Sequence, residues 1–228
     1  MPISLPSFDP RRPWLITAAL ALICALTWTG LHTADRLTWL LEVFPVLIAI
    51  PLLAATQRRY PLTTLLYVGI FCHAIVLIAG GFYTYAKVPL GFWMEDWLGL
   101  HRNPYDKVGH FMQGFVPALV AREILLRGAY VRGAKMLAFL VLCVVMAISA
   151  AYELIEWAAA ISLDQNADDF LGTQGDPWDT QSDMAFAGLG AIAALILVSR
   201  IQNRQIERLY ANGLASAPPH SPDCQTSV

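Results

Sequence analysis

Long apolar stretches separated by short polar segments fill most of the chain. Six of them can be drawn, over residues 14–30, 37–55, 61–82, 103–126, 135–163 and 177–199. Each is close to the ~20 residues that an α-helix needs to cross a bilayer. The pattern predicts an all-α fold, a polytopic membrane bundle of about six transmembrane helices.

The composition also favours a membrane protein. Hydrophobic residues occupy 57% of the 228 positions and charged residues 14%, a balance that excludes an ordinary soluble domain. We expect one six-helix domain over residues 14–199, preceded by a cytoplasmic segment at 1–13 and followed by a cytoplasmic, disordered tail at 200–228. The four cysteines are scattered without a CxxC pair, which argues against a disulfide framework or a zinc site.

The basic residues predict the orientation. Ten of the fifteen Lys and Arg residues fall in the N-terminal segment, in the connections after the second and fourth helices, and after residue 199. Four fall on the other side: Arg36, Lys87, Arg102 and Lys107. Because basic loops stay in the cytoplasm, both termini are predicted to be cytoplasmic. Topology thus explains the basic residues, and nothing points to nucleic-acid binding.

An aromatic segment connects the third and fourth predicted helices. Between residues 82 and 97, six aromatic rings are interleaved with Lys87, Glu95 and Asp96. Aromatic rings with polar edges settle at the level of the lipid headgroups, which predicts a short interfacial helix around residues 92–98. The segment could cover a site on the outer face, or anchor the chain without any chemistry.

Acidic residues are concentrated near the outer ends of the last two helices and in the connection between them. Residues 153–183 hold eight of the seventeen Asp and Glu residues, and no Lys or Arg occurs between residues 136 and 199. These carboxylates must therefore find their counter-charge elsewhere in the chain. By the predicted orientation, they face the periplasm or the cell exterior.

Three sets of polar residues share one helix face each through i,i+3 or i,i+4 spacing: Asp106 with His110, Glu153 with Glu156, and Asp176 with Asp179 and Asp183. At 1.5 Å per residue, His110, Glu156 and Asp183 lie roughly 9–10 Å below the outer helix ends, and Glu153 roughly 14 Å. Ionisable groups at such depth are costly and face the interior of a bundle. We expect these four groups to share one layer.

Several acids also have a structural explanation. Asp176-Pro177-Trp178-Asp179 and Asn103-Pro104-Tyr105-Asp106 both follow the pattern of a helix start, with a capping residue, proline at the first helical position and an acid at the third. Asp164, Asp168 and Asp169 fit a solvated loop. Glu42 fits an interfacial position, and His73 fits a hydrogen bond to a neighbouring helix.

Carboxylates combined with an imidazole are suitable ligands for a divalent cation. The candidate metal ligands are His110, Glu156, Asp183, Asp179 and Asp176, and the candidate catalytic residues are Glu153, His110, Asp106 and Lys107. Two alternatives stay open. Crowded carboxyl groups can share a proton, or the polar groups can form a structural hydrogen-bond network between the last three helices.

Three motifs resemble a known family. NPYDKVGHFMQGFVPALVAREILLR, AYELIEW and DDFLGTQGDPWDTQSDM occur in this order and are similar to the YjdF-like family of bacterial inner membrane proteins over about residues 61–199. The resemblance implies a multi-pass inner membrane protein, and it implies no reaction. It marks as a signature Asp106, Lys107, His110, Glu153, Glu156, Asp176, Asp179 and Asp183.

A more distant pattern resembles the VanZ-like proteins, which are linked to glycopeptide resistance. It consists of the DKxxH helix start, a helix that bears Glu, and a last helix that begins with Asp.

The first functional hypothesis is an outward-facing membrane enzyme. In it, His110, Glu156 and Asp183 hold a divalent metal ion. Glu153 acts as the base, and the substrate is a phosphorylated lipid or a cell-envelope precursor.

Two hypotheses come from other classes, and the sequence leaves open whether the chain is an enzyme. A proton- or cation-coupled transport protein would need Glu42 or His73 to continue a path to the cytoplasm. A structural or sensory partner of another membrane complex would depend more on the aromatic segment 82–97 than on the acids.

Overall fold

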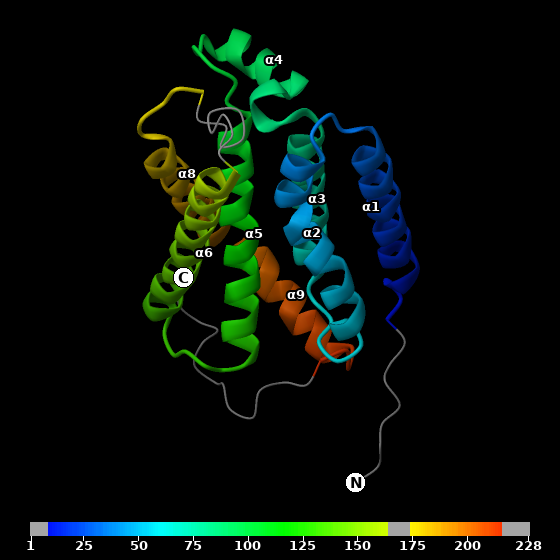
Figure 1. Ribbon diagram of the computed structural model, residues 1–228. Helices are drawn as coiled ribbons and strands as arrows, with labels where there is room; N and C mark the ends of the chain where they lie inside the picture. The colour runs from blue at the N-terminus through cyan, green and yellow to red at the C-terminus, as the bar shows by residue number, and fades with distance from the viewer. Residues whose placement is uncertain (1–8, 164–173, 216–228) are drawn as a thin grey trace.

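The computed structural model describes residues 9–163 and 174–215 and is all-helical over them. The helices are α1 Arg12–His32, α2 Arg36–Thr56, α3 Thr64–Tyr83, α4 Pro89–Leu98, α5 Tyr105–Arg127, α6 Ala134–Leu163, α8 Asp179–Ala193 and α9 Ser199–Ala211 (Figure 1). A 3-10 turn, Tyr85–Lys87, precedes α4, and a π-helical turn, Ala194–Val198, joins α8 to α9. The predicted all-α class is confirmed.

Five helices are long and apolar enough to cross a membrane: α1, α2, α3, α6 over Ala134–Ile161, and the continuous run from α8 to α9 over Asp179–Ala211. The helix α5 has 23 residues, which is a spanning length. It is more polar than the five because charged residues occupy both of its ends. The predicted set of about six membrane helices corresponds to the five spans together with α5.

The polar helix α5 runs through the middle of the bundle and packs against α3, α6 and α8 (Figure 1). The helix α4 and the start of α8 lie at one end of the bundle, here called the α4 end. The turns between α2 and α3 and between α5 and α6 lie at the other, the α9 end. Enclosure by apolar helices is what allows α5 to carry charges in a membrane protein.

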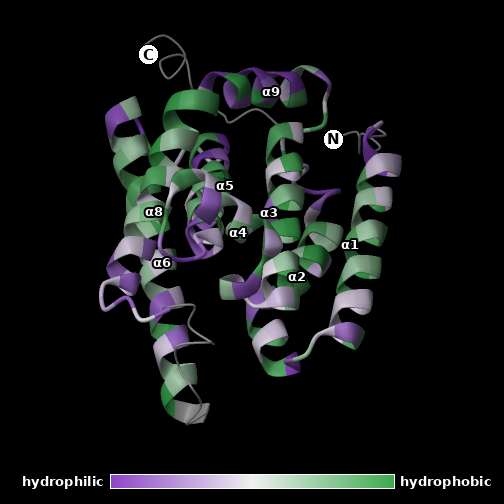
Figure 2. Ribbon diagram, turned by 90° about the horizontal axis from the view of Figure 1, so that it is seen from above, coloured by the Kyte–Doolittle hydropathy of each residue, from purple (hydrophilic) through white to green (hydrophobic). Residues whose placement is uncertain are grey.

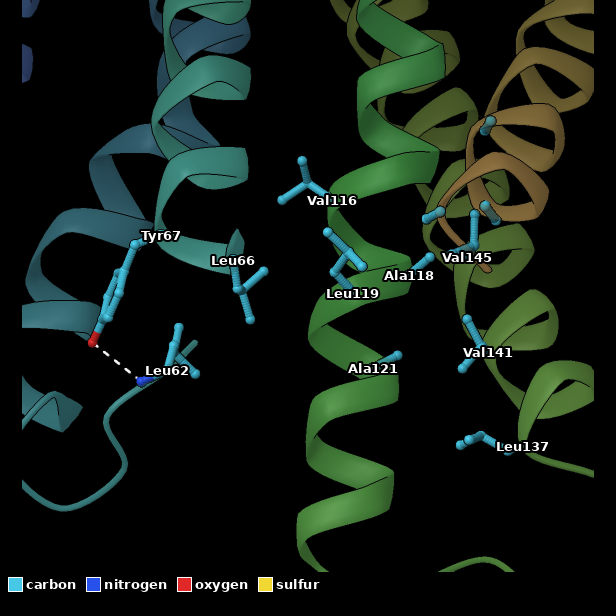
Figure 3. Close-up of a cluster of buried hydrophobic side chains, with 13 residues drawn as sticks. Leu62, Leu66, Tyr67, Val116, Ala118, Leu119, Ala121, Leu137, Val141 and Val145 are labelled. Atoms are coloured by element: carbon cyan, nitrogen blue, oxygen red, sulfur yellow. Dashed lines mark hydrogen bonds between the residues drawn. The ribbon is translucent and has the colours of Figure 1, made fainter. Parts of the chain in front are cut away.

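The hydrophobic core forms on both sides of α5 (Figure 3). Val116 and Leu119 project from α5 toward Leu66 of α3, while Val141 and Val145 of α6 approach from the other side. All five side chains are at most 3% exposed. This packing holds α5 in place and so determines where its polar end residues lie.

The backbones of α5 and α8 approach each other at two glycines. A Cβ atom added at Gly114 would meet the carbonyl group of Ala187, and one added at Gly190 would meet the backbone of Phe111 and Phe115. Small residues allow this closeness between membrane helices. The contact matters for the site because α5 and α8 carry most of its polar residues.

Replacing Gly190 by alanine is expected to lower the free energy of unfolding by about 1–3 kcal/mol, the usual cost of overpacking. The added methyl group would press on helix backbone, which cannot turn away as the end of a side chain can. Gly188→Ala is the matched control, because its Cβ would lie 3.5 Å from the Met146 Sδ atom, an ordinary contact. Thermal unfolding in detergent compares the two variants, and equal midpoints would contradict the close helix contact.

The last two elements differ from the sequence prediction. The helix α8 begins at Asp179, not at Pro177, because Asp176 Oδ1 accepts a hydrogen bond from the Trp178 N–H (2.9 Å) in a turn before the helix. Residues 199–211 form α9 where the prediction expected the start of a disordered tail.

The helix α9 is amphipathic (Figure 2). Its buried side chains, Gln202, Ile206 and Leu209, are spaced i, i+4 and i+7 and so face the bundle together. Residues 1–8, residues 216–228 and the predicted loop acids Asp164, Asp168 and Asp169 lie outside the described residues.

A buried polar network at the α9 end ties α5 to the α2–α3 connection and to α9. Glu123 is 0% exposed and accepts hydrogen bonds from the Thr63 N–H (3.1 Å), the Thr63 hydroxyl (2.7 Å) and Arg127 Nη1 (2.9 Å). Next to it, Arg122 Nη1 donates to Gln202 Oε1 (2.9 Å). Glu123 and Arg122 are thus both paired, and a satisfied network of this kind fixes the arrangement of helices.

Candidate functional site

The first turn of α5 positions one side of the candidate site. Asn103 Oδ1 accepts a hydrogen bond from the Tyr105 N–H (3.0 Å), which satisfies one of the free donors at the start of the helix. The first two turns of α5 then carry Asp106, Lys107 and His110. Asp106 and His110 are buried. The first turns of α5 therefore line one side of an enclosed polar site.

Lys107 joins three carboxylates. Its Nζ atom lies 3.3 Å from Asp106 Oδ2 and 2.8 Å from Asp179 Oδ1, and it also donates to Asp183 Oδ1. Asp106 comes from α5, and the two other acids come from α8. Because α8 has no basic residue of its own, this ammonium group supplies its counter-charge from the neighbouring helix α5.

A second cation, Arg102, lies at the outer edge of the site. Arg102 bridges two acids, with Nη2 2.7 Å from Asp176 Oδ2 and Nη1 3.0 Å from Asp179 Oδ1. Beside it, Gln174 accepts from the Asn103 N–H (3.2 Å) and donates to the Asn103 carbonyl (2.9 Å). These contacts hold the start of α5 against the segment before α8.

His110 lies at the centre of the deeper layer. Its Nε2 atom is 3.4 Å from Asp106 Oδ1 and 3.7 Å from Asp183 Oδ1. Its Nδ1 atom is 3.0 Å from Gln113 Oε1 and 3.9 Å from Glu153 Oε1. If Nδ1–H donates to Gln113, the lone pair of Nε2 faces the two aspartates.

Asp106, His110 and Asp183 suit a divalent metal ion, because one ligand atom from each lies within 4.8 Å of the other two. Ligand atoms that each lie about 2.1 Å from one ion are separated by about 3.0–3.4 Å at angles of about 90–109°, close to the Nε2–Oδ1 distances. Glu153 Oε1 is buried without a hydrogen-bond partner among the described residues. An orphaned carboxylate oxygen beside the three residues is a further sign of room for a cation or its water.

The carboxyl groups of Glu42 and Glu156 lie on the α2 side of the same layer. Both residues line one small pocket between α2 and α6, and Glu42 interacts with the Tyr85 hydroxyl. Burial, together with the neighbouring Glu42 carboxyl, raises the pKa of Tyr85 well above its ordinary value. Tyr85 therefore stays protonated and can donate to Glu42.

The sequence-predicted residues other than Glu156 separate into three groups in space. His110, Asp183 and Glu153 come together as expected, and Asp106, predicted as catalytic, completes the group with metal-ligand spacing. Asp179, with Lys107, lies just above them, and Asp176 is held by Arg102. Which of them act on a metal or a substrate stays a prediction.

Glu156, a predicted metal ligand, is not part of the group of Asp106, His110 and Asp183 that the described residues form. Residues three apart on a helix differ by about 60° around its axis, so Glu156 turns from Glu153 toward α2, where it lines the pocket with Glu42.

Sequence reasoning missed Glu42 as a member of the layer. The available signal was depth, because Glu42 lies six residues after Arg36, about 9 Å along α2. His73 Nε2 has no hydrogen-bond partner among the described residues. The transport path that Glu42 or His73 would continue stays a prediction.

The comparisons with known proteins agree with this architecture. The model of a family described as predicted membrane protein (DUF2238) matches residues 14–204. The chain belongs to this family. It is also 65% identical over 194 residues to the inner membrane protein YjdF of Escherichia coli (strain K12), covering 85% of this chain and 93% of that protein.

These matches confirm the resemblance to the YjdF-like family. The family match begins at residue 14, so it also covers the first two helices, which lie before residue 61. The VanZ-like resemblance receives no support from them. No solved structure matches the chain. The family description and the name of the relative establish a membrane protein and assign no reaction.

Proposed function

We propose that the protein is a divalent-metal-dependent enzyme of the bacterial inner membrane that acts on a phosphorylated lipid or cell-envelope precursor. The observation that carries this proposal is the buried group of Asp106, His110 and Asp183, with ligand atoms within 4.8 Å of one another. The Glu153 Oε1 atom beside it, which has no hydrogen-bond partner in the described part of the chain, supports the same conclusion.

The roles of the residues follow from their contacts. Asp106, His110 and Asp183 would hold the ion, and Gln113 would orient His110 through its Nδ1 atom. When bound, such an ion polarises a phosphoryl oxygen and lowers the pKa of a bound water. Glu153, whose Oε1 atom lies 3.9 Å from His110 Nδ1, would be the base that holds a proton next to the ion.

The proposed substrate class follows from charge and depth. Arg102 lies above the deeper layer, at the rim, where its side chain is more exposed than that of Lys107 (26% against 12%) and its charge suits phosphate oxygens. The α4 end lies at the ends of helices that are long and apolar enough to cross a membrane, so we expect the headgroups of surrounding lipids at the same level. The distribution of basic residues supports an outward-facing site on the periplasmic side.

The proposal predicts about one divalent ion per chain in protein purified in detergent without chelators and measured by elemental mass spectrometry. Asp183→Asn and His110→Ala should each weaken binding at least tenfold, as loss of a ligand or its support does. Asp96→Asn is the matched control, because Asp96 is exposed on α4. Phosphate release from lipid phosphates should fall with the metal content.

Two results would overturn the proposal. One is a folded wild-type protein that holds no metal and takes up neither Mn²⁺ nor Zn²⁺ on titration. The other is metal content that stays the same in the Asp183→Asn and His110→Ala variants.

A further inference from the structure

A pocket opens on the side of the bundle between α2 and α6, next to the candidate site. It is lined by Leu41, Glu42 and Phe44 of α2 and by Tyr152, Ile155, Glu156 and Ala159 of α6. In the described part of the chain, α2 packs on α1 and α3, and α6 packs on α5 and α8, so α2 and α6 share no extended surface. Ile155, on the rim, is 45% exposed, so the pocket faces the surrounding lipid.

Neither acid in this pocket forms an ion pair with a cation among the described residues, and His110, the positive group that acts on both, already contacts Asp106 and Asp183. Glu156 forms no hydrogen bond or ion pair within the described residues, although its side chain is partly buried. Glu42 interacts with Tyr85, which is neutral. The nearby Lys107 ammonium is already held by Asp106, Asp179 and Asp183. Holding two partly buried carboxylates together is costly, and a positive charge between them lowers that cost, as a shared proton also does.

The walls of the pocket suit an ammonium group. Phe44 and Tyr152 stack with their ring centroids 5.8 Å apart and their planes at 12°. The Tyr152 hydroxyl donates to the Leu41 carbonyl (3.4 Å), which holds the ring across the opening. Aromatic faces attract cations, and carboxylates accept the hydrogen bonds of an ammonium group. Together these groups favour a small cation with N–H donors.

The depth of the pocket matches a lipid headgroup. Glu42 lies six residues from the start of α2 and Glu156 seven from the end of α6, about 9 and 10 Å along the helices. The 30 residues of α6 extend about 45 Å, beyond a hydrocarbon core of about 30 Å. The two carboxyl groups therefore lie near the boundary between headgroups and acyl chains.

We propose that the α2–α6 pocket binds the primary ammonium headgroup of an aminophospholipid, which enters sideways from the bilayer. The ammonium contacts Glu42 and Glu156 beside the Phe44–Tyr152 pair, and the acyl chains remain in the membrane. The binding is independent of the metal-dependent chemistry. Only its use as the substrate subsite of Asp106, His110 and Asp183 rests on the function proposed above.

Lipid retention by the purified protein tests the proposal. Wild type is incorporated into nanodiscs with equal parts of phosphatidylethanolamine, phosphatidylcholine and phosphatidylglycerol, extracted into detergent, and analysed by native mass spectrometry. Phosphatidylethanolamine should be retained about tenfold over phosphatidylcholine, which corresponds to ~1.4 kcal/mol. Phosphatidylcholine carries the same net charge but has no N–H donor.

The Glu42→Gln/Glu156→Gln double variant should lose this preference, and the exposed Glu207→Gln should keep it. If the double variant fails to fold, the single Glu156→Gln replaces it, because Glu156 makes no hydrogen bond within the described residues. Equal retention of both lipids by wild type would overturn the proposal, and so would an unchanged preference in the Gln variants.

Metal content measured on the same samples separates the two proposals. Loss of the lipid preference with the metal retained in the Gln variants supports a separate headgroup pocket. A wild type that prefers phosphatidylethanolamine but holds no metal would refute the enzyme and leave the pocket intact.

Discussion

Replacing Glu123 by leucine is expected to lower the free energy of unfolding by about 3–5 kcal/mol, the range for removing one partner of a buried ion pair. Glu123 is 0% exposed and is the acceptor for Arg127 Nη1 and for both donors of Thr63. Leucine fills much of the same volume but removes the acceptor of both Thr63 donors and the carboxylate partner of Arg127, whose Nη1 atom keeps only its hydrogen bond to the neutral Pro61 carbonyl (2.7 Å) among the bonds of the described residues. The loss arises from the stranded Arg127 charge more than from the missing contact.

A matched pair of variants isolates that charge. Glu123→Leu/Arg127→Met should recover part of the loss, since an apolar pair can replace a buried ion pair. The exposed Glu207→Leu on α9 should change stability by less than about 0.5 kcal/mol. Unfolding in detergent is followed by tryptophan fluorescence. A Glu123→Leu variant as stable as Glu207→Leu would show that the network does not hold the bundle.

Local patterns predicted the helices well, since each of the five apolar spans stands out in the sequence. The start of α5 was also visible, because Asn103-Pro104 is helix-start chemistry and Asn103 does accept from the Tyr105 N–H. The buried face of α9 was harder to find. Its spacing was present, but Gln202 is one of its three buried residues, and a polar residue in that position hides the pattern.

Contacts between helices could not be predicted from these local patterns. The Glu42 side chain reaches the layer of His110 because of how α2 is turned about its own axis. That orientation depends on the packing of α2 against α1 and α3. The pairing of Glu123 with Thr63 joins residues sixty positions apart. Periodicity predicts which residues share a face of one helix, and it does not predict which neighbour that face meets.

The second large effect is expected at Lys107. Replacing it by methionine removes the ammonium group that contacts Asp106, Asp179 and Asp183. In the presence of a chelator, the three carboxylates then repel one another, and the midpoint of thermal unfolding should fall by several degrees, about 2–4 °C for each kcal/mol lost. A divalent ion that restores the midpoint would take over the role of the lysine.

Lys107 and a metal ion compete for the same oxygens, since Lys107 holds Asp106 and Asp183, two of the three proposed ligands. Lys107→Met should therefore bind Mn²⁺ or Zn²⁺ about 10–100-fold more tightly than wild type, which corresponds to ~1.4–2.7 kcal/mol. Arg102→Met is the control, because Arg102 contacts Asp176 and Asp179, which lie outside the three ligands. Calorimetric titration measures the metal affinity of both variants and of the wild type. Weaker metal binding in Lys107→Met would mean that the lysine supports the site, and an unchanged affinity would place the ion away from Asp106 and Asp183.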